Sequence, residues 1–158
     1  MKLNKIYQKY LKNELTKPNY ILSMHKKHQL LFDYFDYIKT TDIQSIVIEN
    51  EQIYVTIKGS GLKLFLDRLD YRFIPFEILN FKSIDPAWKD IVHLLASKSK
   101  IIFDIGANIG WYSMIFSKLE NVEKIFAFEP IPHTYNYLKK HIQTNKIKNI
   151  YPNNLALT

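Results

Sequence analysis

The second half of the chain alternates short apolar runs with helical patterns, and this alternation restricts the fold more than any other feature. The runs "IIFDI" at 101–105 and "KIFAF" at 124–128 are almost continuously apolar, which is typical of buried parallel strands. A third strand is predicted at about 149–153, with helices at about 110–119 and 132–145. Short loops between strand, helix and strand imply right-handed crossovers, so the sequence predicts an α/β fold with a parallel sheet.

The first 98 residues indicate a different organisation, and we predict a domain boundary between residues 98 and 99. Residues 2–14 and 20–39 carry helical patterns, the second with apolar side chains three and four positions apart. Residues 43–67 are rich in β-branched residues and contain two turn signals, which predicts a small antiparallel meander of three strands. Residues 68–84 are mixed and aromatic, and their pattern predicts no element.

The stretch "DPAWKDIVHLLA" has the signals of a further helix before the parallel sheet. Asp85 is the expected N-cap, Pro86 the first helical residue, and Trp88 belongs to the apolar face. The preceding turns of the meander are expected at Glu49–Gln52 and Gly59–Gly61. The N-terminal region 1–98 is therefore predicted to combine helices with the meander.

Composition excludes several classes of protein. The chain has no cysteine, which excludes a disulfide framework and a cysteine-based metal site, and no His, Asp and Glu cluster has ligand spacing. We therefore expect no metal. No apolar run approaches the roughly 18 residues that a membrane span needs, and the start has no apolar signal segment. We expect a cytoplasmic protein without a transmembrane segment.

The formal net charge of +7 is concentrated at the N-terminus. Residues 1–30 contain seven Lys and one Glu, which gives +6 and leaves +1 for the rest. Arg68 and Arg72 are the only arginines among 22 basic residues, and bidentate recognition of phosphates and bases favours Arg. We therefore expect a solvated basic helical face and no nucleic-acid partner, with an anionic membrane or an acidic partner as the alternative.

The segment "IIFDIGANIGWYS", residues 101–113, contains two of the four glycines, Gly106 and Gly110. It follows a predicted parallel strand, and ligands of open parallel sheets bind at the carboxyl ends of the strands. A glycine there allows a sharp turn and the close approach of a ligand, while the next helix presents its N-terminal amides. This loop is therefore the candidate ligand site.

Two classes of ligand use such a loop. A dinucleotide requires the pattern G-x-G-x-x-G, but Asn108 replaces the second glycine and Gly106 and Gly110 lie four residues apart. S-adenosylmethionine (SAM) has no phosphate, and its ammonium group needs acceptors such as an Asn carbonyl or an acid. The loop therefore favours SAM, and a dinucleotide-dependent oxidoreductase is the alternative.

Glu129 ends the second predicted strand, 25 residues after Asp104. An acid at this position can accept hydrogen bonds from both ribose hydroxyls of an adenosine ligand. Sites for NAD use the same device, so Glu129 does not separate the two ligand classes. Pro130 and Pro132 stiffen the turn into the next helix.

Three motifs, "FDIGANIGWYS", "FAFEPIPHTYNYLKKHIQTN" and "NNLAL", resemble the FkbM-type family of SAM-dependent methyltransferases over residues 101–158. The resemblance implies a Rossmann-like methyltransferase with SAM as cofactor, acting on a hydroxyl of a sugar or natural product. It places the methionyl part of SAM near Asp104, Gly106, Asn108 and Gly110, the ribose at Glu129, and the adenine near Phe128, Pro130, Asn154 and Ala156.

By analogy with the family, the expected fold class is a truncated Rossmann-like methyltransferase sheet with the first three parallel strands, preceded by N-terminal helices and a small meander. Residues 99–158 would be the N-terminal half of the SAM-binding domain, and the truncated chain would be inactive alone. Strand 101–105 would lie at an open edge. The expected partners are a small-molecule or glycan acceptor, and a partner chain or second copy at that edge. The alternative is a non-catalytic remnant that acts as a binding module.

Ordinary structural roles compete with these assignments. Asp104 can cap or brace the following helix, Asn108 can be a turn residue, and Trp111 and Tyr112 are expected to be packing residues. His133 follows the F-E-P turn and is a weak candidate for a base, so the catalytic residue stays unassigned. The remaining histidines are expected at the surface or the core edge: His25, His28, His93 and His141.

Overall fold

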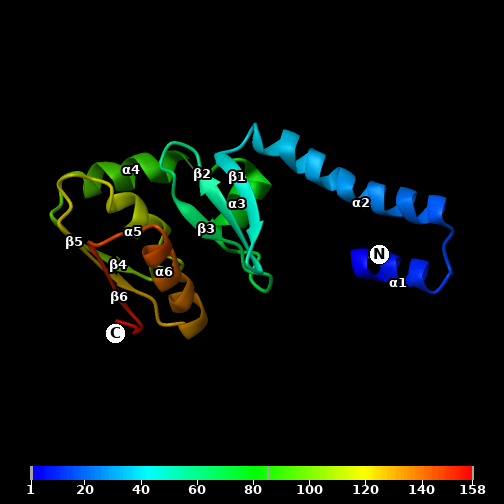
Figure 1. Ribbon diagram of the computed structural model, residues 1–158. Helices are drawn as coiled ribbons and strands as arrows, with labels where there is room; N and C mark the ends of the chain where they lie inside the picture. The colour runs from blue at the N-terminus through cyan, green and yellow to red at the C-terminus, as the bar shows by residue number, and fades with distance from the viewer. Residues whose placement is uncertain (1, 85, 158) are drawn as a thin grey trace. The chain divides into compact units, whose positions relative to one another are not determined.

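The computed structural model describes residues 2–84 and 86–157, without the side chains of 86–89. The chain forms two compact units, Met1–Thr40 and Thr41–Thr158 (Figure 1). The first unit contains only helices, and the second contains the meander, the parallel sheet and four helices. The domain boundary predicted after residue 98 stays a prediction.

The first unit is a pair of helices, α1 (Leu3–Leu11) and α2 (Lys17–Ile38), close to the two predicted helical ranges. Ile6 is buried between them, and Tyr10 stacks on Tyr20 with ring centroids 4.4 Å apart. None of the residues of α2 is buried. Much of its predicted apolar stripe is therefore exposed, with Leu31 and Phe35 each 60% exposed.

The second unit begins with the predicted meander, in the order β1-β2-β3. The strands are β1 (Ile43–Glu49), β2 (Gln52–Ile57) and β3 (Lys63–Phe65), all antiparallel. Asn50 and Glu51 form the tight turn between β1 and β2 with φ of 46° and 62°. Both positive values fit a two-residue hairpin, so the meander and its first turn are confirmed.

Two helices link the meander to the parallel sheet. Helix α3 (Ile74–Phe81) lies in the stretch for which the sequence predicted no element, and it ends at Lys82, whose φ of 72° is left-handed. Helix α4 (Pro86–Ala96) matches the predicted helix. Its expected N-cap, Asp85, and the side chain of Trp88 lie outside the described residues.

The parallel sheet has the order β4-β5-β6, with strands β4 (Ile101–Ile105), β5 (Lys124–Phe128) and β6 (Ile150–Asn153). Helix α5 (Trp111–Phe116) joins β4 to β5, and α6 (Pro132–Thr144) joins β5 to β6. Figure 1 shows α6 beside these strands. The α/β fold with a parallel sheet of three strands is confirmed, and β4 is an edge strand in the described part of the chain, as predicted.

The two faces of the parallel sheet differ. Right-handed crossovers in one direction place α5 and α6 on the same face, where Ile125 and Ala127 are fully buried. On the other face Phe103 is 62% exposed, and it stacks on Phe126 with centroids 5.3 Å apart. The apolar strands predicted to be covered on both faces are therefore covered on one face by the described residues.

No helix among the described residues is long and apolar enough to cross a membrane.

Candidate functional site: the loop after β4

Residues Gly106 to Gly110, here called the cofactor loop, connect β4 to α5. Gly106, Asn108 and Gly110 have φ angles of 76°, 52° and 88°, all in the left-handed region. Glycine adopts this region without strain, and Asn adopts it more readily than most residues. The pattern G-A-N-I-G therefore places a suitable residue at each left-handed position, which explains why Asn108 can stand where a glycine was expected.

The two glycines of the cofactor loop serve different purposes. A Cβ atom added to Gly106 would meet no atom within 4 Å, so the backbone there is open to a ligand. A Cβ atom added to Gly110 would lie much closer to Leu138 Cδ1 on α6 than the normal contact distance of two carbon atoms. Gly110 is thus required by packing against α6, and Gly106 by the turn.

Three backbone amides fasten the cofactor loop to the end of β5. The N–H groups of Gly106 and Ala107 both donate to the carbonyl oxygen of Phe128, at 2.9 Å each. The N–H of Asn108 donates to Glu129 Oε2, also at 2.9 Å. In this structure these three amides hold the loop against the neighbouring strand.

Glu129 is 5% exposed and lies directly beside the cofactor loop. Its Oε2 accepts from Asn108, and its Oε1 accepts from the N–H of Ile131 at 2.9 Å. A carboxylate offers about four acceptor positions, so two remain for other donors. Glu129 therefore organises the turn and the loop while it keeps acceptor capacity for a pair of hydroxyls.

Asp104 lies within β4 and faces α5. Ser113 Oγ donates to Asp104 Oδ2 at 2.6 Å. Burial raises the pKa of the Asp104 carboxyl, and hydrogen bonds from Ser113 oppose that rise. Asp104 thus braces the first turn of α5, which is the structural role that competed with a cofactor contact.

Asn154 follows β6 and ties that strand to the turn after β5. Its Nδ2 donates to the carbonyl oxygens of Glu129 at 2.8 Å and Pro130 at 3.1 Å. Phe128 is half-buried at the end of β5, and Ala156 is exposed. The structure therefore brings the residues predicted around the ribose and the adenine to the carboxyl edge of the sheet.

His141 on α6 is fully buried, so the expectation that it lies at the surface or core edge was wrong. Its Nε2 accepts from the N–H of Phe65 at 2.8 Å, and its Nδ1 lies 2.9 Å from the carbonyl oxygen of Ile109. Burial lowers the pKa of His141 to about 4, so the ring is neutral near pH 7. Its place beside Leu138 and Ile142 on the apolar face of α6 was the available sequence signal.

Asn145 lies one turn after His141 and bonds to the same strand, β3. Its Oδ1 accepts from the N–H of Lys63 at 2.8 Å, and its Nδ2 donates to the carbonyl of Lys63 at 2.9 Å. Lys63, which carries both groups, lies 82 residues before Asn145 in the sequence. No local pattern in the sequence identifies such a contact.

His133, the weak candidate for a base, is bonded through Nε2 to Asp67 Oδ2. Asp67 is 5% exposed and also accepts from the N–H of Leu69 at 2.8 Å. Burial alone would raise the pKa of Asp67, but the hydrogen bonds from Leu69 and His133 lower it. The pair lies at the N-terminus of α6, directly after the Glu129 turn.

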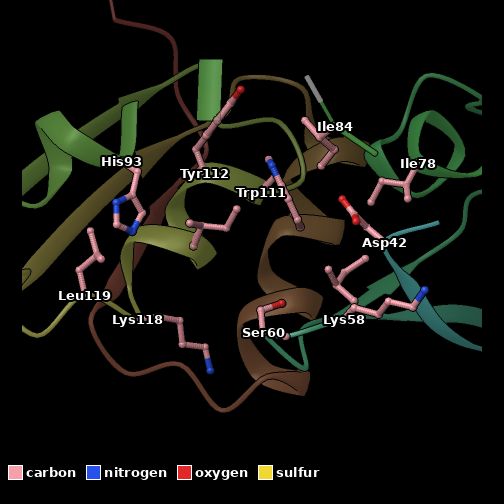
Figure 2. Close-up of a pocket in the computed structure, with 13 residues that line it drawn as sticks. Asp42, Lys58, Ser60, Ile78, Ile84, His93, Trp111, Tyr112, Lys118 and Leu119 are labelled. Carbon is pink, nitrogen blue, oxygen red and sulfur yellow. The ribbon is translucent and has the colours of Figure 1, made fainter. Parts of the chain in front are cut away.

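A pocket of about 590 Å³ runs along α5 between the meander and α4. Figure 2 shows Trp111 and Tyr112 beside it, together with His93 and Lys118. None of the nine residues predicted to surround the cofactor lines this pocket. Trp111 is 8% exposed, which agrees with a packing role.

A second pocket, of about 540 Å³, is lined by β4, α4 and α5 and includes Asp104 and Ile105. This pocket adjoins the start of the cofactor loop. Within the ranges 2–84 and 86–157, no group of three or more His, Asp or Glu residues could hold a metal ion.

No family model matches the chain. Over 108 residues it is 31% identical to tRNA (guanine(37)-N(1))-methyltransferase Trm5b of Pyrococcus abyssi, which covers 68% of this chain and 30% of that protein. Over 58 residues it is 28% identical to tRNA(Phe) (4-demethylwyosine(37)-C(7)) aminocarboxypropyltransferase of Methanocaldococcus jannaschii, covering 37% of this chain and 23% of that protein. The chain spans less than a third of the length of these relatives.

Solved structures give similar matches. Trm5b of P. abyssi aligns with a TM-score of 0.44 at 20% identity, covering 68% of this chain and 34% of that one. TYW2 of M. jannaschii in complex with AdoMet aligns with a TM-score of 0.41 at 18% identity, and the alignment covers 73% of this chain and 44% of that one. The aTrm5 chain of a complex with tRNALeu aligns with a TM-score of 0.43 at 23% identity, and the alignment covers 73% of this chain and 28% of that one.

The expected class, a SAM-dependent methyltransferase, agrees with the name of Trm5b, whereas the second curated relative is named as an aminocarboxypropyltransferase and neither is named as an FkbM-type enzyme. The expectation of a small-molecule or glycan acceptor and no nucleic acid is contradicted, because both curated relatives are named as enzymes of tRNA. The small-molecule acceptor was implied by the FkbM resemblance, and the exclusion of nucleic acid relied on the confinement of the charge to residues 1–30 and on the scarcity of Arg. Attraction to a phosphate backbone requires positive charge, which Lys supplies as well.

Proposed function

We propose that residues 101–157 form the SAM-binding part of a SAM-dependent methyltransferase. The single observation that carries the proposal is the bond from Asn108 N–H to the buried carboxylate of Glu129, at 2.9 Å. It joins a glycine loop and a strand-end acid into one site at the carboxyl edge of a parallel sheet. The identity of 31% over 108 residues to a tRNA methyltransferase supports the same class.

Different residues of the chain would contact different parts of the cofactor. The open backbone at Gly106 suits the methionyl part of SAM, and the two remaining acceptor positions of Glu129 suit the ribose hydroxyls. Phe128 would border the adenine together with Pro130, whose carbonyl oxygen accepts from Asn154. The sulfonium of SAM supplies the activated methyl group, so the protein's contribution is to hold cofactor and acceptor in line.

We further propose RNA as the acceptor class, on the names of the curated relatives and the basic first unit. Residues 1–40 contain eight Lys and three acids, or +5 of the net +7. Four of these lysines lie along α1 at spacings of three, four and three, which puts them on one side of the helix: Lys2, Lys5, Lys9 and Lys12. Such a stripe is complementary to a phosphate backbone.

The cofactor proposal is tested by calorimetric titration of the full chain with SAM and with NAD. Glu129→Gln should weaken SAM binding about tenfold or more, since an NH2 group replaces an acceptor of the buried carboxylate. Glu120→Gln, at an exposed acid, is the matched control and should bind like the wild type. Equal affinities of the two variants would remove the role of Glu129. Binding of NAD without SAM would favour an oxidoreductase.

The acceptor proposal is tested by the salt dependence of binding to a tRNA transcript. Replacing Lys5, Lys9 and Lys12 with Gln should lower the slope of log K against log salt by about 2. The control replaces three lysines of the second unit: Lys98, Lys118 and Lys148. Equal slopes in the two triple variants, or no binding by the wild type at low salt, would refute the RNA proposal.

A further inference from the structure

Side chains at the C-terminal end of helix α6 form hydrogen bonds with backbone groups on the outer edge of strand β3. β3 pairs with β2 on one side only, and the other edge of such a strand carries N–H and C=O groups that need partners. The side chain of Asn145 accepts a hydrogen bond from the N–H of Lys63 and donates one to its carbonyl oxygen, and His141 Nε2 accepts one from the N–H of Phe65. Two side chains one helical turn apart thus replace part of a neighbouring strand.

The same helix contacts the cofactor loop. Because His141 Nε2 accepts from an amide, the proton of the neutral ring is on Nδ1, which then donates to the carbonyl of Ile109. Leu138, one turn earlier, packs against Gly110. One imidazole ring therefore joins the edge of the meander to the middle of the cofactor loop.

The environment of His141 leaves the ring little freedom. It is fully buried and stacks on Phe65 at a centroid distance of 5.6 Å. Its loop partner, Ile109, directly follows Asn108, whose amide holds Glu129. A displacement of β3 would therefore be passed through a rigid ring to the residues that organise the candidate site.

We propose that His141 is a positioning residue for the cofactor loop. Through His141, the position of strand β3 against α6 sets the affinity for SAM. The proposal rests on the function proposed above. It implies reciprocity: bound SAM must also hold β3 more firmly on α6, because a coupling free energy acts equally in both directions.

Two substitutions separate the two bonds of the ring. The amide of Asn falls near the position of Nδ1, so His141→Asn can keep the bond to Ile109 and loses the bond to Phe65. The amide of Gln reaches the position of Nε2, so His141→Gln can keep the bond to Phe65 and loses the bond to Ile109. Asn145→Leu releases Lys63 of β3 at a residue with no hydrogen bond to the cofactor loop.

The control is Tyr135→Phe, which removes a hydrogen bond from α6 to Pro152. This bond lies outside the relay, by which we mean the contacts from β3 through Asn145 and His141 to the cofactor loop. All variants are first checked for a wild-type circular dichroism spectrum, and SAM is then titrated by calorimetry well below the melting temperature. The affinity of a folded protein at that temperature does not depend on its global stability. A residue that only stabilises the fold would therefore leave the affinity for SAM unchanged.

The expected results are a loss of SAM affinity of about tenfold for His141→Gln, and of about fivefold for both His141→Asn and Asn145→Leu. Tyr135→Phe should bind like the wild type. In hydrogen exchange, saturating SAM should slow the amides of Lys63 and Phe65 in the wild type. Wild-type affinity in His141→Gln and Asn145→Leu would overturn the proposal.

Failure of the proposed function can be distinguished from failure of this inference. If the wild type binds no SAM, the relay still requires that Asn145→Leu speeds hydrogen exchange at residues 106–110, which Asn145 does not contact through a hydrogen bond. Unchanged exchange at these residues would then overturn the relay itself.

Discussion

Acidification should destabilise this protein through His141 in particular. The pKa of His141 is about 4 in the folded chain, against 6.5 for an unperturbed histidine. A base with a lowered folded pKa contributes stability that is complete above the unfolded pKa and is lost as the pH falls towards the folded pKa. Between pH 7 and pH 4 the difference in pKa corresponds to a loss of about 3 kcal/mol in the free energy of unfolding.

The structure gives the cause of this loss. Protonation of His141 would put a second N–H donor on Nε2, which faces the N–H of Phe65 at 2.8 Å. The charge would also be fully buried, with the Lys140 ammonium as a further positive charge nearby. The N–H of Phe65 cannot accept the new proton, so the bond between them is lost.

The assay is urea unfolding of the wild type and His141→Gln between pH 7 and pH 4, followed by tryptophan fluorescence. Both tryptophans belong to the second unit, so the signal reports the unit that contains His141. All other titrating groups are shared, so the difference between the two proteins isolates His141. The stability advantage of the wild type should shrink by about 3 kcal/mol towards pH 4. Parallel stability curves would refute the reasoning.

Further predictions concern the cofactor loop. Both glycines have a left-handed φ, which should cost Gly106→Ala about 1 kcal/mol of the free energy of unfolding; Gly110→Ala should cost about 2 kcal/mol, because its Cβ would in addition overlap Leu138. Equal losses in urea unfolding would contradict this packing argument. Ser113→Ala should raise the pKa of the Asp104 carboxyl further, since the opposing hydrogen bond is lost. A ¹³C NMR titration of Asp104 measures the change, and an unchanged or lower pKa would refute it.

The sequence predicted most of the second unit because its signals are local. Apolar runs identified β4 and β5, the periodicity of residues 132–144 identified α6, and two residues with positive φ closed the predicted hairpin of the meander. The cofactor loop was found for the same reason, since Gly and Asn directly mark left-handed backbone. Helix α3 was missed because its short aromatic sequence shows no clear period.

What the sequence could not show depends on residues far apart in the chain. The burial of His141 follows from the arrival of β3, and its partner Phe65 lies 76 residues away. The pair of Asp67 with His133 spans 66 residues in the same way. The partner was misjudged because the concentration of charge in residues 1–30 and the scarcity of Arg were both taken as evidence against nucleic acid, although a local cluster of Lys also attracts a phosphate backbone.

The central claim is that the cofactor loop and Glu129 together hold SAM, and a crystal structure of the full chain with SAM tests it most directly. The account predicts ribose hydroxyls within hydrogen-bond distance of Glu129 and a methionyl group over Gly106. SAM found instead in the pocket beside Trp111 and Tyr112, or with its ribose away from Glu129, would contradict the account.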